Sequence, residues 1–349
     1  MFVAVNPFIS LFRKRLRCGA RAALAFGMVQ LTAAASATGL TVLMSDDLAA
    51  HSEFVQHLRA GQEPGGRFDL VRLPQGGADT SQAVEAAAAE PDRGANAGVR
   101  TRGLRTASAD AGMTLAVGVP AARAALERPG QQPLVLAMLS RLDYETLRAS
   151  SPALRRGDRR VGVLLRDPAM GDQLALVGAV LPNKYRIGVV ATPESEPLVR
   201  ELQRAAQGAN PPWDVQVEYA PDARSLAAAL HSVVPRSDAL MVLPDLIGDS
   251  QAATLSVLRA GATAGLPVFG TSDGLVRSGG LAAAVSTPGQ LAQQARALGQ
   301  KLAMGPVAGG VLVEAATPST VRLNPNVARG LGLRLPEERE LTERVTAAR

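Results

Sequence analysis

One stretch of the chain, Ser237–Thr271, constrains the fold more than any other. It begins with Ala239–Leu243, a short apolar run typical of a strand that is buried on both faces. Apolar residues then recur at helical spacing as far as Gly265, and Leu266–Phe269 is a second apolar run. A strand, a helix and a strand in this order predict a parallel pair of strands with a right-handed crossover.

The same alternation recurs on both sides of this stretch. One series of strands and helices occupies residues 40–140, and a second occupies residues 170–304. Each series is long enough to form its own parallel sheet, so the sequence predicts an α/β fold with two doubly wound lobes. We expect the arginine-rich segment Ser150–Arg160 to connect the lobes and Val161–Leu165 to be a strand or part of a hinge.

Several small or polar residues stand where the predicted strands end. Ser45, Val119 and Ser140 follow strands of the first series, and Asp245 and Asp273 follow strands of the second. In sheets of this kind, ligands bind outside the carboxyl ends of the strands. A cleft between two lobes would bring both sets of ends together. The spacing alone is equally compatible with ordinary polar loops in water.

Residues 1–37 have the features of a secretory signal peptide. Basic residues precede a short apolar core, Ala22–Leu31, and Ala35–Ala37 fits a small-residue cleavage site. We expect cleavage after Ala37 and a soluble, periplasmic protein; an uncleaved amphipathic anchor is the alternative. Because this segment holds five basic residues and no acid, its removal lowers the formal net charge from +6 to +1. The basicity of the chain is therefore no sign of nucleic-acid binding, and none is expected.

Cofactor and metal chemistry has no support in the sequence. The single cysteine, Cys18, lies within the predicted signal peptide, so the mature chain has no thiolate ligand and no disulfide. His51 and His57 are not at the i, i+4 spacing of a metal-binding helix, and we expect both to be partly exposed. Neither a phosphate-binding loop nor a dinucleotide-binding glycine pattern occurs. We expect no metal, no cofactor and no enzymatic activity.

One catalytic pattern does occur. Gly270–Gly274 matches G-x-S-x-G, the nucleophile elbow of serine hydrolases, with Ser272 at its centre. That motif needs a helix directly after the serine and a histidine later in the chain. Leu275–Gly280 contains two further glycines and is a poor helix, and all three histidines precede Ser272. A glycine-rich turn is the simpler interpretation, and an exported hydrolase is a third hypothesis.

From Leu181 to Pro336 the chain resembles the substrate-binding proteins of ABC transporters, specifically the tryptophan- and tyrosine-type family. Four segments in one order carry the resemblance: LPNKYRIGVV, SDALMVLPD, LPVFGTSDGLVRSGGLAAA and VRLNPNVARGLGLRLP. The resemblance implies a type I periplasmic-binding fold with two Rossmann-like lobes, three hinge crossings and a small ligand held between the lobes. It places the first lobe at residues 38–156 and 279–304, and the second at residues 157–278 and 305–349.

The resemblance also implies a ligand site and partners. Its ligand-binding residues would be Ser45, Val119, Ser140, Asp245 and Asp273. The protein would be a monomer that binds a small molecule by hinge closure and delivers it to an ABC permease in the inner membrane. Two departures from the family pattern, Ser286–Gln290 and Ser140–Asp143, and the scarcity of aromatic residues argue against a stacked aromatic ligand. They leave open an alternative: an accessory or sensory protein on the same fold that contacts a membrane receptor and has lost or changed its ligand.

Overall fold

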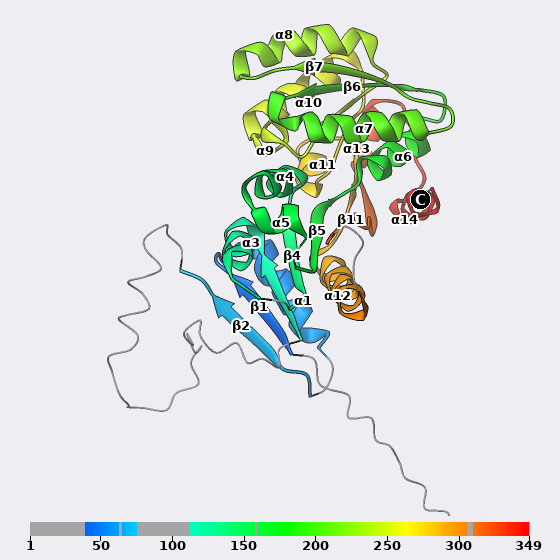
Figure 1. The fold of residues 1–349 in the computed structure, drawn as a ribbon. Coiled ribbons are helices and arrows are strands. Elements are labelled where there is room, and N and C mark those ends of the chain that lie inside the picture. Colours follow the sequence, from blue (N-terminus) through cyan, green and yellow to red (C-terminus); the bar gives the residue numbers. More distant parts are fainter. Residues whose placement is uncertain are drawn as a thin grey trace, which may run out of the picture. The chain divides into compact units, whose positions relative to one another are not determined.

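Two six-stranded sheets flanked by helices make up the described part of the chain in the computed structural model (Figure 1). The described residues are 39–62, 65–74, 112–130, 132–157, 159–305 and 310–348. The predicted signal peptide lies outside them, so it stays a prediction. Among the described residues, no helix combines the length and the apolar character that crossing a membrane requires.

The first sheet is parallel throughout, in the order β11-β5-β4-β3-β1-β2. Every residue of β1 and β4 is buried, as expected for apolar strands covered on both faces. The strands are Leu40–Met44 (β1), Phe68–Arg72 (β2), Met113–Val117 (β3), Leu134–Leu139 (β4), Val161–Pro168 (β5) and Val311–Ala316 (β11).

Helices cover both faces of the first sheet. Val42 points to the face where α1 and α12 pack side by side, and the neighbouring Leu43 points to the face covered by α3, α4 and α5. The helices are Ala49–Ala60 (α1), Gly118–Glu127 (α3), Arg141–Ser150 (α4), Pro152–Arg156 (α5) and Pro288–Met304 (α12).

The second sheet has the order β12-β10-β9-β8-β6-β7. Its strands are parallel except for β12, which pairs antiparallel with β10 at one edge. The strands are Arg186–Ala191 (β6), Asp214–Tyr219 (β7), Ala239–Met241 (β8), Val268–Gly270 (β9), Ala282–Val285 (β10) and Thr320–Leu323 (β12).

The second sheet is also covered on both faces. Ile187 and Val189 pack with α6, α7, α13 and α14, while Val190 and Leu240 pack with α8 and α10. The helices are Met170–Val180 (α6), Pro193–Ser195 (η1), Glu196–Gly208 (α7), Ala223–Val233 (α8), Val234–Arg236 (η2), Leu246–Asp249 (α9), Gln251–Ala264 (α10), Asp273–Arg277 (α11), Pro325–Gly330 (α13) and Glu338–Ala347 (α14).

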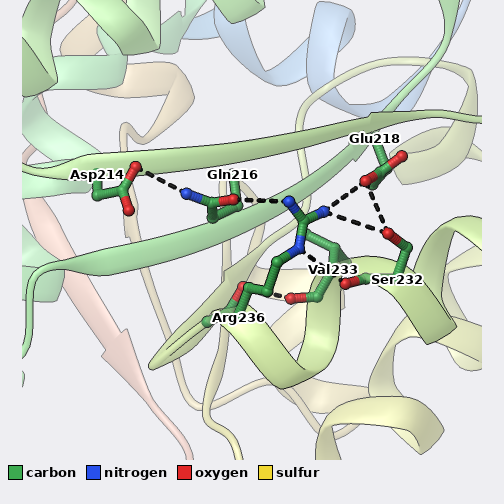
Figure 2. A network of polar contacts seen from close by, with 7 residues as sticks. Asp214, Gln216, Glu218, Ser232, Val233 and Arg236 are labelled. Atoms are coloured by element: carbon green, nitrogen blue, oxygen red, sulfur yellow. Dashed lines mark hydrogen bonds and ion pairs between the residues drawn. The ribbon is translucent and has the colours of Figure 1, made fainter.

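Polar side chains line the exposed edge strand β7 and form what we call the edge network (Figure 2). Asp214, Gln216 and Glu218 alternate along β7 and therefore share one face. Gln216 donates to Asp214 at 2.8 Å, and the Arg236 guanidinium donates to Gln216 at 3.0 Å and also to Glu218. Ser232 of α8 donates to Glu218 at 2.8 Å. Each acid in this network has a donor from the chain itself.

Within the described residues, the chain passes between the two sheets three times: from β5 to α6, from β10 to α12 and from β11 to β12. These crossings lie together. Pro168 at the end of β5 pairs with Ala316, and the Ser286 hydroxyl donates to the Thr317 carbonyl at 2.6 Å. The α/β architecture with two mostly parallel sheets is confirmed, and three crossings are present as the resemblance implied.

The sheets correct the expected lobe boundaries at three strands. β5 and β11, expected in the second lobe, belong to the first sheet, and β10, expected in the first lobe, belongs to the second sheet. The segment Ser150–Arg160 does not connect lobes, because it contains α5 and leads into β5 of the same sheet. Strand pairing decides membership, and local apolar runs carry no information about pairing partners.

Candidate functional site

A polar cavity of about 480 Å³ lies at the carboxyl ends of β8 and β9, next to the end of β5. Arg166 and Asp167 of β5 line it from the side of the first crossing. Val242–Pro244 and Thr271–Ser272 line it directly after β8 and β9. Helices α9, α10 and α11 contribute the remaining lining residues: Gly248, Asp249, Gln251, Thr254, Leu255, Gly274, Leu275 and Ser278. The sequence prediction pointed to the end of the second sheet where this cavity lies, but its acids Asp245 and Asp273 are neighbours of the lining residues and do not line the cavity.

Two further hollows are less suited to a polar ligand. One, of about 470 Å³, lies between α8 and α10 and is lined mainly by apolar side chains and by His231 and Arg259. The other, of about 540 Å³, is formed by β12, α13 and the residues that follow them. Neither lies at the carboxyl ends of the parallel strands, where ligands of doubly wound sheets bind.

Asp167 is the most perturbed acid at the cavity. Burial raises its pKa to about 6, Arg166 opposes that rise, and the negative charges of Asp249 and Asp143 add to it. Arg166 Nε lies 3.6 Å from Asp167 Oδ2. That oxygen is buried and accepts no hydrogen bond from the described residues. The sequence analysis missed Asp167, although a charged pair directly after the apolar run Val161–Leu165 is the same signal that selected Asp245.

Asp245, a predicted ligand-binding residue, accepts hydrogen bonds from other groups of the protein. It is 1% exposed and is the N-cap of the short helix α9. The Ser195 hydroxyl donates to it at 2.5 Å, and the backbone N–H groups of Ile247 and Gly248 donate at 2.9 and 3.1 Å. Burial raises the pKa of Asp245, and these donors oppose the rise. The carboxylate therefore holds the β8–α9 turn together.

Asp273, the second predicted acid, begins α11, and 42% of its side chain is exposed. It forms ion pairs with Arg277 and with Arg322, the latter at 3.6 Å. Its neighbour Ser272 lines the cavity and caps α11 by accepting from the Leu275 N–H at 3.2 Å. A five-residue helix follows Ser272, which serves as its cap, and it ends at Arg277. The segment Leu275–Gly280, expected to be a poor helix, is therefore helical only as far as Arg277.

Two of the three predicted residues of the first sheet also have local structural roles. The Ser140 hydroxyl caps α4 and exchanges hydrogen bonds with Asp143 in a capping box. Val119 lies in the first turn of α3 and packs against the apolar cluster on that face. Neither Ser140 nor Val119 lines the cavity described above.

Ser45, the remaining predicted residue, is buried, and its hydroxyl has no hydrogen-bond partner among the described residues. Close by in the chain, His51 Nδ1 lies 2.7 Å from Asp46 Oδ1. His51 is 8% exposed, so the expectation of a partly exposed side chain was wrong for it. Gly118 has φ +79°, and a Cβ there would lie 2.8 Å from His51 Cε1. The backbone at the end of β3 thus approaches the histidine ring closely.

An ion pair connects α4, which packs on the first sheet, with α7, which packs on the second. The Arg141 guanidinium donates to Glu201 Oε2 through Nε at 3.1 Å and Nη2 at 2.9 Å. The other oxygen of Glu201 accepts from the Met170 N–H at 3.0 Å, at the start of α6. Both charged side chains are at least three-quarters buried. A motion of one sheet relative to the other would have to break or rearrange this ion pair.

Comparison with known proteins identifies similar chains. A family model described as ABC transporter substrate binding protein matches residues 106–343. The ligand-free, open structure of CD0873, a substrate binding protein with adhesive properties from Clostridium difficile, matches with a TM-score of 0.60 and 16% identity, covering 86% of this chain and 96% of that one.

A second solved structure, a conserved domain protein from Vibrio cholerae, matches with a TM-score of 0.51 and 19% identity. The match covers 88% of this chain and 98% of that one. The search of curated proteins gives no match. At these identities the structural likeness shows the fold alone, which is the type I periplasmic-binding fold.

Proposed function

This chain belongs to the family of ABC transporter substrate binding proteins, and from that premise we propose that it binds a small hydrophilic molecule in the cavity at the ends of β8 and β9. Delivery of that molecule to an ABC permease in the inner membrane would be its role. The observation that carries the proposal is the position of the cavity. It lies at the carboxyl ends of parallel strands, beside the crossing at Pro168, and polar and charged residues line it.

We propose hinge closure as the mechanism. The crossings at residues 168–169, 286–287 and 317–319 are short, and they are hydrogen-bonded to one another. A change of a few backbone angles there would move one sheet with its helices against the other. A ligand that touches both Asp167 of β5 and residues of the second sheet would favour the conformation in which both contacts exist.

The remaining parts of the proposal come from the sequence and the family. Export through the predicted signal peptide would place the protein in the periplasm, where a permease can receive the solute. We propose that it acts as a monomer with no resident cofactor and no catalytic role.

Thermal unfolding of the purified protein with amino acids, amines, sugars, nucleosides and organic acids tests solute binding. A ligand present at about 100 times its Kd should add about 2.7 kcal/mol to the free energy of unfolding, or roughly 5 °C or more. Replacing exposed Ser278, which lines the cavity, in Ser278→Trp should abolish that shift.

Thr263→Trp is the matched control, because Thr263 is also exposed and lines the separate hollow between α8 and α10. Its ligand-induced shift should equal that of the wild type. No shift with any compound class, or a shift that survives Ser278→Trp, would remove this cavity as the solute site.

One observation favours the second candidate, an accessory or sensory protein that contacts a membrane receptor. Ser140, Asp245 and Asp273 are all engaged with other groups of the protein. These are residues that the family resemblance implies for ligand binding. If they bond to the protein itself, the protein has changed or lost its ligand. Capture of a membrane receptor at equal yield with and without solute, combined with a negative thermal panel, would favour this candidate.

A further inference from the structure

Asp167 is a mostly buried acid at the cavity whose charge the protein compensates only weakly. Its side chain is 18% exposed, and Oδ2 accepts no hydrogen bond from any described residue. The nearest cation, Nε of Arg166, is 3.6 Å from that oxygen, beyond ordinary hydrogen-bond distance. A carboxylate in this position has lost much of its hydration without gaining donors in return, which is energetically costly.

The charges on neighbouring elements increase that cost. Asp249 at the end of α9 and Asp143 in the first turn of α4 both repel the Asp167 carboxylate, and only Arg166 on its own strand attracts it. Together with burial, the largest cause, they raise the pKa of Asp167 to about 6. Arg166 is itself 39% exposed, so its charge is partly screened by water. The environment of Asp167 therefore carries an excess of negative charge.

Elsewhere the chain supplies donors to a buried aspartate. Asp245 receives three hydrogen bonds from Ser195, Ile247 and Gly248, on the same side of the second sheet. The fold can therefore satisfy a carboxylate near these strand ends, and it does not do so at Asp167. A donor to Asp167 Oδ2 and a second positive charge besides that of Arg166 are properties that a ligand can supply.

Building on the proposed function, we propose that the cavity takes a small hydrophilic amine, protonated at neutral pH, whose ammonium group donates hydrogen bonds to Asp167. An ammonium group offers three donors and one positive charge, and Asp249 provides a second carboxylate in the same cavity. The hydroxyl groups of Thr271 and Ser278 also line the cavity and can bond the rest of a polar ligand. None of the described lining residues is aromatic, so the cavity offers no surface for stacking.

Isothermal titration at pH 7.5 with matched probes tests this inference. Putrescine, agmatine and glucosamine are the cationic probes, and 1,4-butanediol, succinate and glucose are the neutral or anionic ones. We expect at least one amine to bind the wild-type protein and its uncharged counterpart not to bind. In Asp167→Asn the amine affinity should fall about ten-fold or more, because a charge-assisted hydrogen bond is lost.

Asp214→Asn is the matched control, because Asp214 belongs to the edge network on β7 and not to the cavity. Its amine affinity should equal that of the wild type. The wild-type affinity should also fall as the pH drops through about 6, where Asp167 gains a proton. Asp167→Asn should lose that pH dependence. A merely structural role of Asp167 would not produce this change.

Equal amine affinity in Asp167→Asn and the wild type would overturn the inference. It would also be overturned if only neutral or anionic compounds bound, and in that case the protein would still bind a solute and the proposed function would stand. If neither these probes nor the thermal panel gave any binding, both the inference and the proposed function would be lost.

Discussion

Two clusters in this protein contain the same kinds of charged residues but differ in their hydrogen bonds. In one cluster the chain supplies donors to the acids, and in the other it leaves an acid oxygen without a donor. In the edge network on β7, Arg236 and Ser232 donate to Glu218, and Gln216 donates to Asp214 (Figure 2). In the cavity at the strand ends, Asp167 has an ion pair at 3.6 Å and a buried oxygen without a donor. The comparison teaches that the kind of residue does not distinguish a structural cluster from a candidate ligand site. What distinguishes them is whether the chain supplies the donors.

The same distinction separates the two buried aspartates near the cavity. Asp245 is a cap whose carboxylate accepts three hydrogen bonds, and Asp167 is an acid with one buried carboxylate oxygen to which no described residue donates. Removing the Asp245 carboxylate should therefore lower the free energy of unfolding, and removing the charge of Asp167 should raise it.

The largest expected effect is that of Asp245→Ala. The substitution leaves the Ser195 hydroxyl and the Ile247 and Gly248 N–H groups without their acceptor in a buried turn. We expect a loss of about 3 kcal/mol in the free energy of unfolding by urea denaturation. Asp222→Ala is the control, because Asp222 caps α8 in the same way at an exposed position; its loss should be clearly smaller. Equal losses would mean that burial of the cap does not matter.

The second effect has the opposite sign. The raised pKa of Asp167, about 6 against an ordinary 3.8, means that the folded state binds a proton more tightly than the unfolded state. Stability from this group therefore falls as the pH rises from about 4 to about 6, and the penalty is complete above that range. Asp167→Asn removes the penalty, so it should raise the free energy of unfolding by about 2 kcal/mol at pH 7.5.

Urea denaturation of the wild type and Asp167→Asn across pH 4 to 7.5 measures this difference. The gain of the variant should shrink strongly toward pH 4, where the carboxyl is protonated in the folded state and about half protonated in the unfolded state. A variant less stable than the wild type at pH 7.5 would show that Asp167 has stabilising partners, and the contrast with Asp245 would collapse.

The sequence predicted the strands well because their signal is local. Ala239–Leu243 is an apolar run that contains β8, and Leu266–Phe269 is an apolar run that overlaps β9. Helix α14 was missed, because its burial depends on only two apolar residues, Leu341 and Val345, in an otherwise polar segment. Lobe membership was predicted wrongly, because pairing assigns it and apolar runs do not show pairing: β5 pairs with β4, β10 pairs with β9, and β11 pairs with the distant β5.

The candidate site was predictable in its location and not in its residues. The rule that ligands bind at carboxyl strand ends selected the edge of the second sheet where this cavity lies. It could not tell Asp245 from Asp167, since both follow apolar runs. The difference lies in which donors the folded chain brings to each carboxylate, and Ser195 lies fifty residues from Asp245. A hydrogen bond between residues this far apart leaves no periodic pattern in the sequence.

A third prediction concerns the ion pair between Arg141 of α4 and Glu201 of α7. It tests how much this pair contributes to stability and whether it affects ligand binding. Arg141→Ala should lower the free energy of unfolding by about 1 kcal/mol, since both Arg141 and Glu201 are largely buried. A cycle with Glu201→Gln isolates the pair. Arg148→Ala, which removes an exposed pair on the same helix α4, is the control and should have little effect.

The apparent Kd of a ligand for the same variants tests whether this ion pair also affects binding. If the Arg141–Glu201 pair holds the sheets in one conformation, removing it changes the fraction of binding-competent molecules and hence the apparent Kd. Small-angle scattering of ligand-free Arg141→Ala and wild type would measure the shift. An unchanged Kd and an unchanged scattering curve would make the pair a static packing contact like those of the edge network.

The smallest effect is expected in the edge network itself. Arg236→Ala removes donors to Gln216 and Glu218, but Arg236 is 47% exposed and water can replace it. We expect a loss of about 0.5 kcal/mol in the free energy of unfolding, declining further in high salt. Ligand affinity should be unchanged, because no residue of the network lines the cavity. A loss as large as that of Asp245→Ala would mean that the network stabilises the sheet edge strongly. In that case, the presence of donors alone would not tell how much a polar cluster contributes.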